Sequence, residues 1–181
     1  HLDNQASKQI IDIELGLQGR SLAIDADGSR LLIGTADGKV LSRSLVDSSV
    51  QTDLMAADDD TAIVRAVAID DYGTLWAITD CLLHHMTVSQ SSWTGTQLCT
   101  SGVLEVPTDL LIFSDKIYVA TAENGMIVLD YNTTSDSTGI SAAIDTYTYW
   151  NTGNYLTSNS ITQLEKLNSN LLIATIGGGV N

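Results

Sequence analysis

Short apolar runs joined by polar turns recur along this chain of 181 residues. In the clearest pair, the runs Val67–Ile69 and Leu75–Ile78 flank an Asp/Gly turn at 70–73, a pattern typical of a β-hairpin. Similar pairs of runs occur at 21–24 with 31–35, at 109–112 with 117–121, and at 161–164 with 171–175. No long apolar pattern with helical spacing competes with them, so the sequence predicts an all-β protein.

The hairpins follow a regular period. Each second run ends in a small residue near a threonine, and the steps between these threonines are 44, 42 and 54 residues (Thr35, Thr79, Thr121 and Thr175). A period of roughly 40–50 residues built from short strands is typical of propeller blades. We therefore expect a β-propeller, or a propeller fragment of about four blades, with four-stranded antiparallel blades.

The repeats are expected within a single, partial domain covering 1–181. Their approximate bounds are 20–55, 62–100, 106–131 and 146–181, with 8–15 as a candidate closing strand. A polar segment at 132–139 is interpreted as an insertion, and the alternating segment 146–150 as a strand leading into the last repeat. That repeat holds only two strands, so we expect the remaining blades to come from missing sequence or from a second chain.

Composition limits the classes of binding partner and the cellular compartments that we expect for this protein. The net charge is −14, from 22 acidic and 8 basic residues, which disfavours binding to nucleic acid and to anionic membranes. The sequence contains no run of about 18 apolar residues, the length that a transmembrane helix needs, so membrane insertion is not expected. We expect an extracellular, periplasmic or cell-surface protein that carries no cofactor.

Two cysteines permit one disulfide. Cys81 and Cys99 lie on the two arms of a proposed hairpin whose midpoint is residue 90, so the symmetry of the hairpin places them opposite each other. A disulfide would imply an oxidising compartment, and a pair of buried free thiols is the alternative. Asn132 begins a formal N-glycosylation sequon, Asn132-Thr133-Thr134.

Candidate ligand-binding residues are few. Four aromatic residues with polar neighbours lie close together in sequence and suit either stacking on a ligand or packing between blades: Tyr147, Tyr149, Trp150 and Tyr155. Asp58–Asp60 offers oxygen ligands for calcium, but a solvated loop between blades is the favoured interpretation of these three residues. His84 and His85 are neighbours on a predicted strand, point to opposite faces and cannot chelate one ion together.

The repeats resemble those of the two-component-regulator propeller family. The segments Leu156–Ile161 and Leu171–Thr175 resemble the entry and exit motifs of that repeat, and Asp71–Thr79 resembles the exit motif with Ala77 in place of the usual glycine. Thr157 replaces the proline of the entry motif. The resemblance implies a propeller that recognises a ligand or a protein outside the cytoplasm, and it transfers no catalytic residue.

Three kinds of function remain open at this stage. The repeats and the lack of a catalytic motif favour a non-catalytic module that recognises a protein or glycan ligand, as an extracytoplasmic sensor or the cell-surface part of a larger protein. A structural surface or fibre component is compatible with the same acidity and Ser/Thr content. A carbohydrate-active enzyme, such as a lyase or glycosidase, would need convergent carboxylates, which the sequence places in turns.

Overall fold

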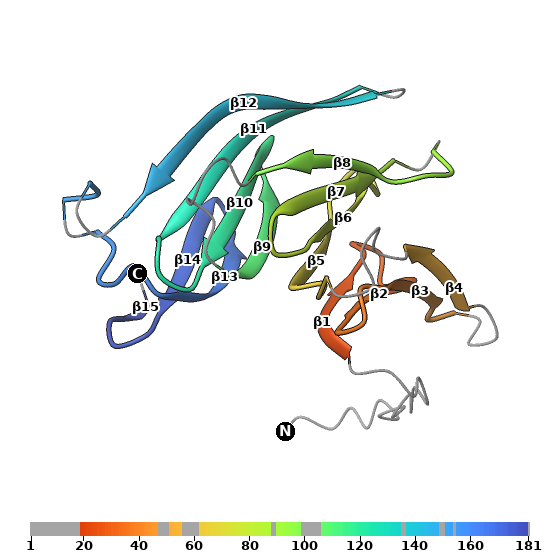
Figure 1. The fold of residues 1–181 in the computed structure, drawn as a ribbon, viewed down its shortest axis with the longest axis horizontal. Helices are drawn as coiled ribbons and strands as arrows, with labels where there is room; N and C mark the ends of the chain where they lie inside the picture. The colour runs from red at the N-terminus through yellow and green to blue at the C-terminus, as the bar shows by residue number, and fades with distance from the viewer. Residues whose placement is uncertain are drawn as a thin grey trace, which may run out of the picture.

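The structure, a computed structural model, describes residues 19–46, 51–55, 62–87, 90–98, 106–134, 137–148, 151–153 and 155–180. Throughout these residues the regular structure is β-strand, in fifteen strands and four sheets, and no helix in them is long or apolar enough to cross a membrane. This confirms the predicted all-β fold. We number the four sheets as blades 1 to 4 in chain order (Figure 1).

Each blade is an antiparallel meander in which every strand pairs with the next along the chain. Blade 1 comprises β1 (Gly19–Ile24), β2 (Arg30–Thr35), β3 (Val40–Ser44) and β4 (Gln51–Met55). Blade 2 comprises β5 (Ala66–Ile69), β6 (Leu75–Ile78), β7 (Leu82–Met86) and β8 (Thr94–Gln97). Blade 3 comprises β9 (Pro107–Phe113), β10 (Lys116–Thr121), β11 (Met126–Thr134) and β12 (Ser137–Tyr147). Blade 4 comprises β13 (Ile161–Leu167), β14 (Asn170–Thr175) and β15 (Gly179–Val180), one strand more than the two expected from the sequence.

Among the described residues, three buried hydrophobic clusters lie between neighbouring blades, and a fourth, with Leu31, Ile33 and Leu41, lies within blade 1. Because side chains alternate along a strand, β5 sends Val67 toward blade 1 and its neighbours Ala66 and Ala68 toward blade 3. Trp76 is fully buried in the layer between blades 2 and 3. A third layer, which contains Met126 and Ile161, joins blades 3 and 4. Strands that face two neighbouring blades are therefore apolar on both sides.

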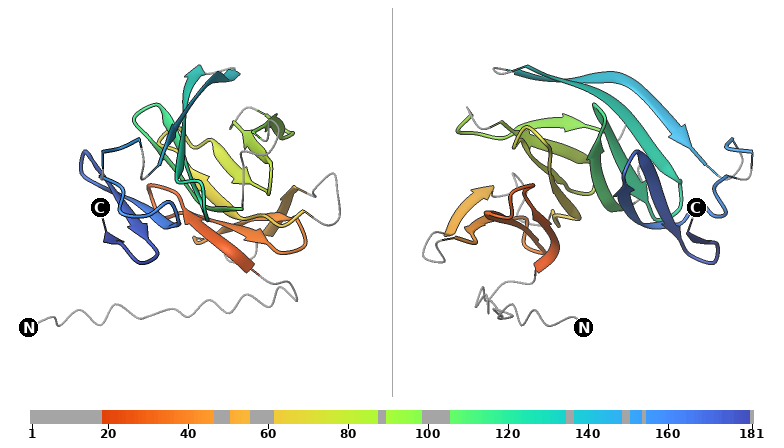
Figure 2. Two further views of the ribbon diagram at one scale, coloured as in Figure 1. Left: turned by 60° about the vertical axis from the view of Figure 1, so that its left-hand side comes forward. Right: turned by 180° about the vertical axis from the view of Figure 1, so that it is seen from behind.

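The inner strands set the order of the blades. β1 packs against β5, β5 against β9, and β9 against β13, so the four blades follow one another around a curved arrangement (Figures 1 and 2). The described residues show no comparable packing between β13 and β1. The Thr108 hydroxyl donates to the Ile161 carbonyl at 2.7 Å, and the Leu164 amide donates to Asp109 Oδ2 at 2.7 Å, which fastens blade 4 to blade 3.

The periodic threonines have a common role. Thr35, Thr121 and Thr175 end the second strands of their blades, Thr79 directly follows β6, and all four are at most 8% exposed. The Thr121 hydroxyl donates to the Gly125 carbonyl at 2.8 Å and accepts from the Asn124 amide at 3.0 Å. The Thr35 hydroxyl makes the equivalent pair of bonds with the backbone of Lys39. These side chains close the turn that leads to the third strand.

Blade 3 extends further along the chain than the repeat expected at 106–131. β11 continues to Thr134 and β12 begins at Ser137, with Asn132 paired to Gly139 and Met126 paired to Tyr147. Residues 132–134 and 137–139 of the supposed insertion are thus paired strand residues of a long hairpin, and residues 146–147 belong to blade 3 instead of leading into blade 4. Polarity alone suggested a loop, but threonine has a high strand propensity and an outer strand needs little apolar surface.

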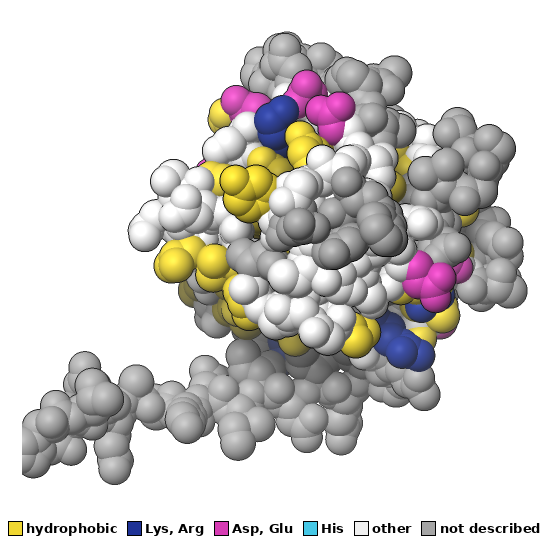
Figure 3. Space-filling view, turned by 90° about the vertical axis from the view of Figure 1, so that its left-hand side faces the viewer, with side chains coloured by type: hydrophobic (Ala, Val, Ile, Leu, Met, Phe, Trp, Pro, Cys, Tyr) yellow, Lys and Arg dark blue, Asp and Glu magenta, His cyan; other side chains and the backbone are white. Residues whose placement is uncertain are grey.

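The two end blades leave apolar side chains on the surface. Leu22 and Ile24 of β1 are 67% and 60% exposed, on the side of the strand opposite blade 2. Ile176 and Val180 of blade 4 are 63% and 70% exposed. Hydrophobic side chains also show on the end of the molecule that carries β12, β14 and β15, among uncharged groups and a few acidic and basic ones (Figure 3). The candidate closing strand at 8–15 lies outside the described residues.

Candidate functional site

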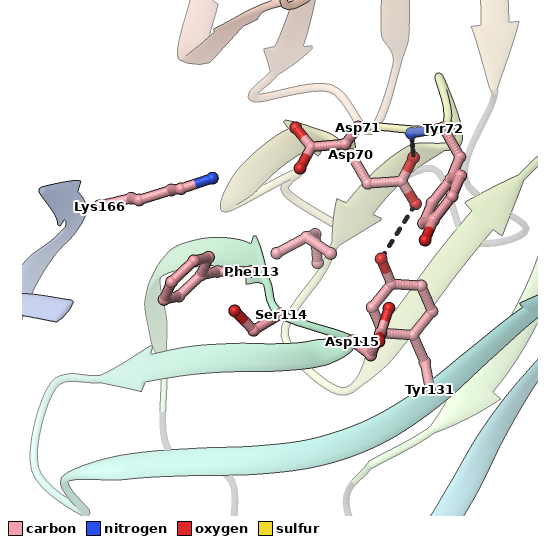
Figure 4. A pocket seen from close by; sticks show the side chains of 9 residues that line it. Asp70, Asp71, Tyr72, Phe113, Ser114, Asp115, Tyr131 and Lys166 are labelled. Carbon is pink, nitrogen blue, oxygen red and sulfur yellow. Dashed lines mark hydrogen bonds between the residues drawn. The ribbon is translucent and has the colours of Figure 1, made fainter. Parts of the chain in front are cut away.

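A cavity of about 260 Å³ opens where hairpin turns of blades 2 and 3 adjoin β13 of blade 4 (Figure 4). The turn from β5 to β6 contributes Asp70, Asp71 and Tyr72, and the end of β9 with the turn to β10 contributes Ile112 to Asp115. Tyr131 of β11 lines the inner side, and Lys166 of β13 reaches in from blade 4. The cavity lies on the side of the blades where first and second strands are connected.

Asp70 holds the wall of the cavity in place. The residue is 5% exposed, and its Oδ1 atom accepts from the amides of Tyr72 at 2.9 Å and Thr74 at 2.8 Å. Oδ2 accepts from Trp76 Nε1 at 3.1 Å. A buried carboxylate with several donors is stabilised by them and has few lone pairs left for a ligand. Asp70 is therefore a structural residue of the β5–β6 turn.

Tyr131 links this turn to blade 3. Its hydroxyl donates to Asp70 Oδ2 at 3.5 Å, and its ring packs edge-on against Trp76 with centroids 5.3 Å apart. Burial, followed by the negative charge of Asp70, raises the pKa of the Tyr131 hydroxyl well above its ordinary value. The phenol thus keeps its proton and serves as a donor, which makes it unsuitable as a base.

The turn between β9 and β10 is conformationally costly. Phe113 pairs with Lys116, which leaves a two-residue loop in which Ser114 and Asp115 both have left-handed backbone angles, with φ of 52° and 57°. Two-residue hairpins of this kind favour Asn-Gly, because side chains other than those of Asn and Asp are disfavoured at positive φ. The chain instead keeps a hydroxyl and a carboxylate here, and both residues line the cavity.

Three exposed charged groups face the cavity: the carboxylates of Asp71 and Asp115 and the ammonium of Lys166. Lys166 Nζ lies 4.8 Å from the centre of the Phe113 ring, a cation–π contact. The ion pairs among the described residues lie elsewhere and join Lys39 to Asp37, Arg65 to Asp80, and Lys116 to Asp130. The cavity therefore presents charges of both signs that the described part of the chain does not neutralise.

Two ionisable groups of the cavity, Asp70 and Tyr131, are already engaged by the fold. Within the described ranges no cluster of three or more His, Cys, Asp or Glu residues is placed to hold a metal ion. Asp70 is occupied by the turn, and Tyr131 is held in its protonated form. What remains is a small polar hollow with one aromatic side and charged groups at its rim.

Two of the aromatic residues singled out from the sequence, Tyr147 and Tyr155, are not among the residues that line the cavity. Tyr147 ends β12 and is 40% exposed, and Tyr155 lies in the connection to blade 4 and is 84% exposed. The ring contacts recorded among the described residues involve neither of them. Tyr149 and Trp150 lie outside the described residues, so an aromatic ligand site at these four positions stays a prediction.

The other predicted positions are placed only in part. The amide of Leu98 donates to the carbonyl of Cys81 at 2.9 Å, and β7 pairs with β8 in a register that aligns Leu82 with Gln97. This places Leu98 opposite Cys81, one residue away from the register we expected. Cys99 and Asp58–Asp60 lie outside the described residues, so the disulfide and a calcium site stay predictions. Asn132, the first residue of the sequon, is a residue of strand β11.

Sequence reasoning missed the cavity because its residues come from three separate hairpins. Asp70 and Asp71 were recognised only as turn residues, and the Ser114-Asp115 loop lacks the glycine that marks most such turns. The available signal was the position of that loop, which falls where the Asp/Gly turn stands in the preceding repeat. Superimposing the repeats would have placed the two turns side by side on one face.

Comparison with known proteins identifies the fold. No family model and no curated protein matches the chain. Among solved structures, the β-propeller domain of Myceliophteria thermophila Cps50 (Swd1) aligns with 14% identity and a TM-score of 0.56, over 87% of this chain and 49% of that one. The designed protein Ika4 aligns with 16% identity and a TM-score of 0.59, over 91% and 89% of the two chains.

A third similar structure comes from a signalling protein. The extracellular domain of the hybrid two-component system protein BT4673 of B. thetaiotaomicron aligns with 16% identity and a TM-score of 0.61, over 90% of this chain. This chain spans only 20% of the length of that domain. At such low identity these likenesses establish the fold alone, and the chain has the β-propeller fold.

Proposed function

We propose that this chain is a non-catalytic recognition module that binds a ligand at the cavity between the hairpin turns of blades 2 and 3 and β13 of blade 4. The observation that carries this proposal is the set of uncompensated charges on Asp71, Asp115 and Lys166 around one hollow. Exposed charges on rigid hairpins are an arrangement for recognition, because a scaffold of strands fixes where each side chain points.

The proposed setting is an extracytoplasmic sensor or the cell-surface part of a larger protein, with further blades supplied by additional sequence or by a second chain. The likeness to the extracellular domain of a two-component system protein supports this setting, and so does the resemblance of the repeats noted above. The strong negative charge of −14 fits a ligand that is neither a nucleic acid nor an anionic lipid.

A thermal-shift screen tests the proposal. The chain is heated in the presence of pooled glycans, peptides and small metabolites, because a ligand that binds only the folded state raises the melting temperature. We expect at least one compound to stabilise the native chain and to lose this effect with Lys166→Ala. Lys39→Ala, which removes a lysine paired with Asp37 in blade 1, is the matched control.

Two results would contradict the proposal. In the first, no compound in any class stabilises the native chain. In the second, Lys166→Ala and Lys39→Ala respond equally to every compound that does. Chemical conversion of a stabilising compound by the chain would instead point to an enzyme.

A further inference from the structure

The chemistry of the cavity narrows the class of ligand, if the proposed function holds. Asp71 and Lys166 point toward one another from opposite sides of the opening, one from blade 2 and one from blade 4 (Figure 4). They are not joined as an ion pair, since the recorded pairs involve other residues of the described chain. A negative and a positive group thus face one hollow with space between them.

The remaining lining adds a second carboxylate and the aromatic rings of Tyr72, Phe113 and Tyr131. Asp115 stands on the β9–β10 turn beside Ser114, which offers a hydroxyl. The ring of Phe113 lies under the Lys166 ammonium, and Tyr72 is 61% exposed at the rim. The volume of about 260 Å³ is below the usual range for drug-sized ligands, so the occupant is small.

We propose that this cavity binds a small zwitterion that carries one ammonium group and one carboxylate, such as a free α-amino acid. The carboxylate of the ligand would pair with Lys166, and its ammonium group would pair with Asp71 and Asp115. The side chain of the ligand would then lie against Phe113 or Tyr72. Each group of the cavity that the chain leaves uncompensated would gain a partner of opposite charge.

Other ligand classes fit less well. A simple anion would satisfy Lys166 but would lie close to the carboxylates of Asp71 and Asp115. A metal ion would find too few ligands in the cavity, because the described residues contain no cluster of three or more His, Cys, Asp or Glu side chains that could hold one. A neutral sugar would bond to these groups without compensating their charges, and groups left unpaired on binding reduce affinity. A molecule with both charges avoids all three penalties.

Calorimetric titration of the full chain tests the assignment. The standard L-amino acids are titrated first, and the one that binds most tightly is then compared with its decarboxylated amine, its deaminated acid and glucose. We expect the amine and the acid to bind about tenfold more weakly than the amino acid, because each lacks one charge-assisted contact. Glucose should show no binding at the same concentrations.

Variants assign each contact to its residue. Lys166→Met should weaken the amino acid about tenfold and leave the amine unaffected. Asp71→Asn should weaken the amino acid and the amine but not the acid. Both residues are exposed, so neither change should disturb folding, and circular dichroism verifies this. Lys39→Met in blade 1 is the control and should bind like the native chain.

The outcomes separate this inference from the proposed function. If no amino acid binds, but a glycan or peptide binds and loses affinity with Lys166→Met, the proposal of a zwitterionic ligand is wrong and the proposal of a recognition module holds. If an amino acid binds with equal affinity to the native chain and to both cavity variants, the assignment of the site is wrong. If no compound of any class binds, both proposals fail.

Discussion

At the scale of single residues, the two adjacent histidines show how a strand gives neighbours different environments. His84 and His85 lie on opposite faces of β7, and His85 is 3% exposed with its ring 5.2 Å from that of Trp76. Its Nδ1 atom is buried without a hydrogen-bond partner. The sequence analysis excluded a shared metal site for this pair, and the structure gives His85 a packing role.

Burial of His85 predicts a loss of stability in mild acid. Burial, and to a lesser extent the nearby charge of His84, lowers the pKa of His85, while in the unfolded chain it stays near 6.5. The unfolded state therefore gains the proton first, so stability is complete above about pH 6.5 and falls as the pH drops toward the lowered folded pKa. Melting temperatures between pH 8 and pH 5 should show this decline.

The variant His85→Phe isolates the contribution of His85 to the pH dependence of stability. Phenylalanine keeps the ring contact with Trp76 and removes the titrating group. We expect the variant to be as stable as the native chain at pH 8 and to decline less toward pH 5. Asp109, whose pKa burial raises, acts in the opposite sense, but it is present in both proteins and cancels in the comparison. An identical decline in both proteins would contradict the prediction.

At the scale of elements, the sequence predicted which strands pair better than it predicted how far each strand extends. The apolar runs and the spaced threonines predicted the inner hairpins, because a core between blades requires apolar residues and a closed turn at each repeat. The outer hairpin of β11 and β12 was misread at 132–139, since few of its positions need to be apolar. The cavity was not predicted, because it exists only where turns from different blades adjoin.

The β9–β10 turn predicts a conflict between stability and binding. Replacing Ser114 by Asn and Asp115 by Gly would supply the residues that a turn with two positive φ angles favours. We expect the double variant to gain about 1 kcal/mol and to melt about 2–4 °C higher. The same change removes a hydroxyl and a carboxylate from the cavity, so ligand affinity should fall. Calorimetry and thermal unfolding measure the two effects separately.

Asn168 provides the control for this prediction. It has a φ of 56° in the hairpin between β13 and β14, outside the lining of the cavity. Asn168→Gly should therefore not lower the melting temperature, and ligand affinity should stay unchanged. If the double variant at Ser114 and Asp115 is less stable than the native chain, the native turn is not strained. The prediction that these two residues favour binding at the expense of stability is then wrong.

At the scale of the whole molecule, the blades stabilise one another only where a neighbour exists. Blades 2 and 3 are covered on both faces, and their inner strands are buried accordingly. β1 is covered on the side of Ala23 alone, which leaves Leu22 and Ile24 exposed on the other side. Packing a further blade against that side would bury the same kind of surface that blades 1 and 2 bury against each other.

The exposed side of β1 predicts that the isolated chain associates with itself. Light scattering at about 0.15 M salt, where the repulsion from the net charge of −14 is screened, should show a mass that rises with protein concentration. Leu22→Lys with Ile24→Lys should abolish the rise, although it lowers the repulsion by adding two positive charges, because the apolar contact is lost. Val46→Lys, at a position 83% exposed outside β1, should retain association. A native chain that stays monomeric over a hundredfold range of concentration would show that this surface needs no partner.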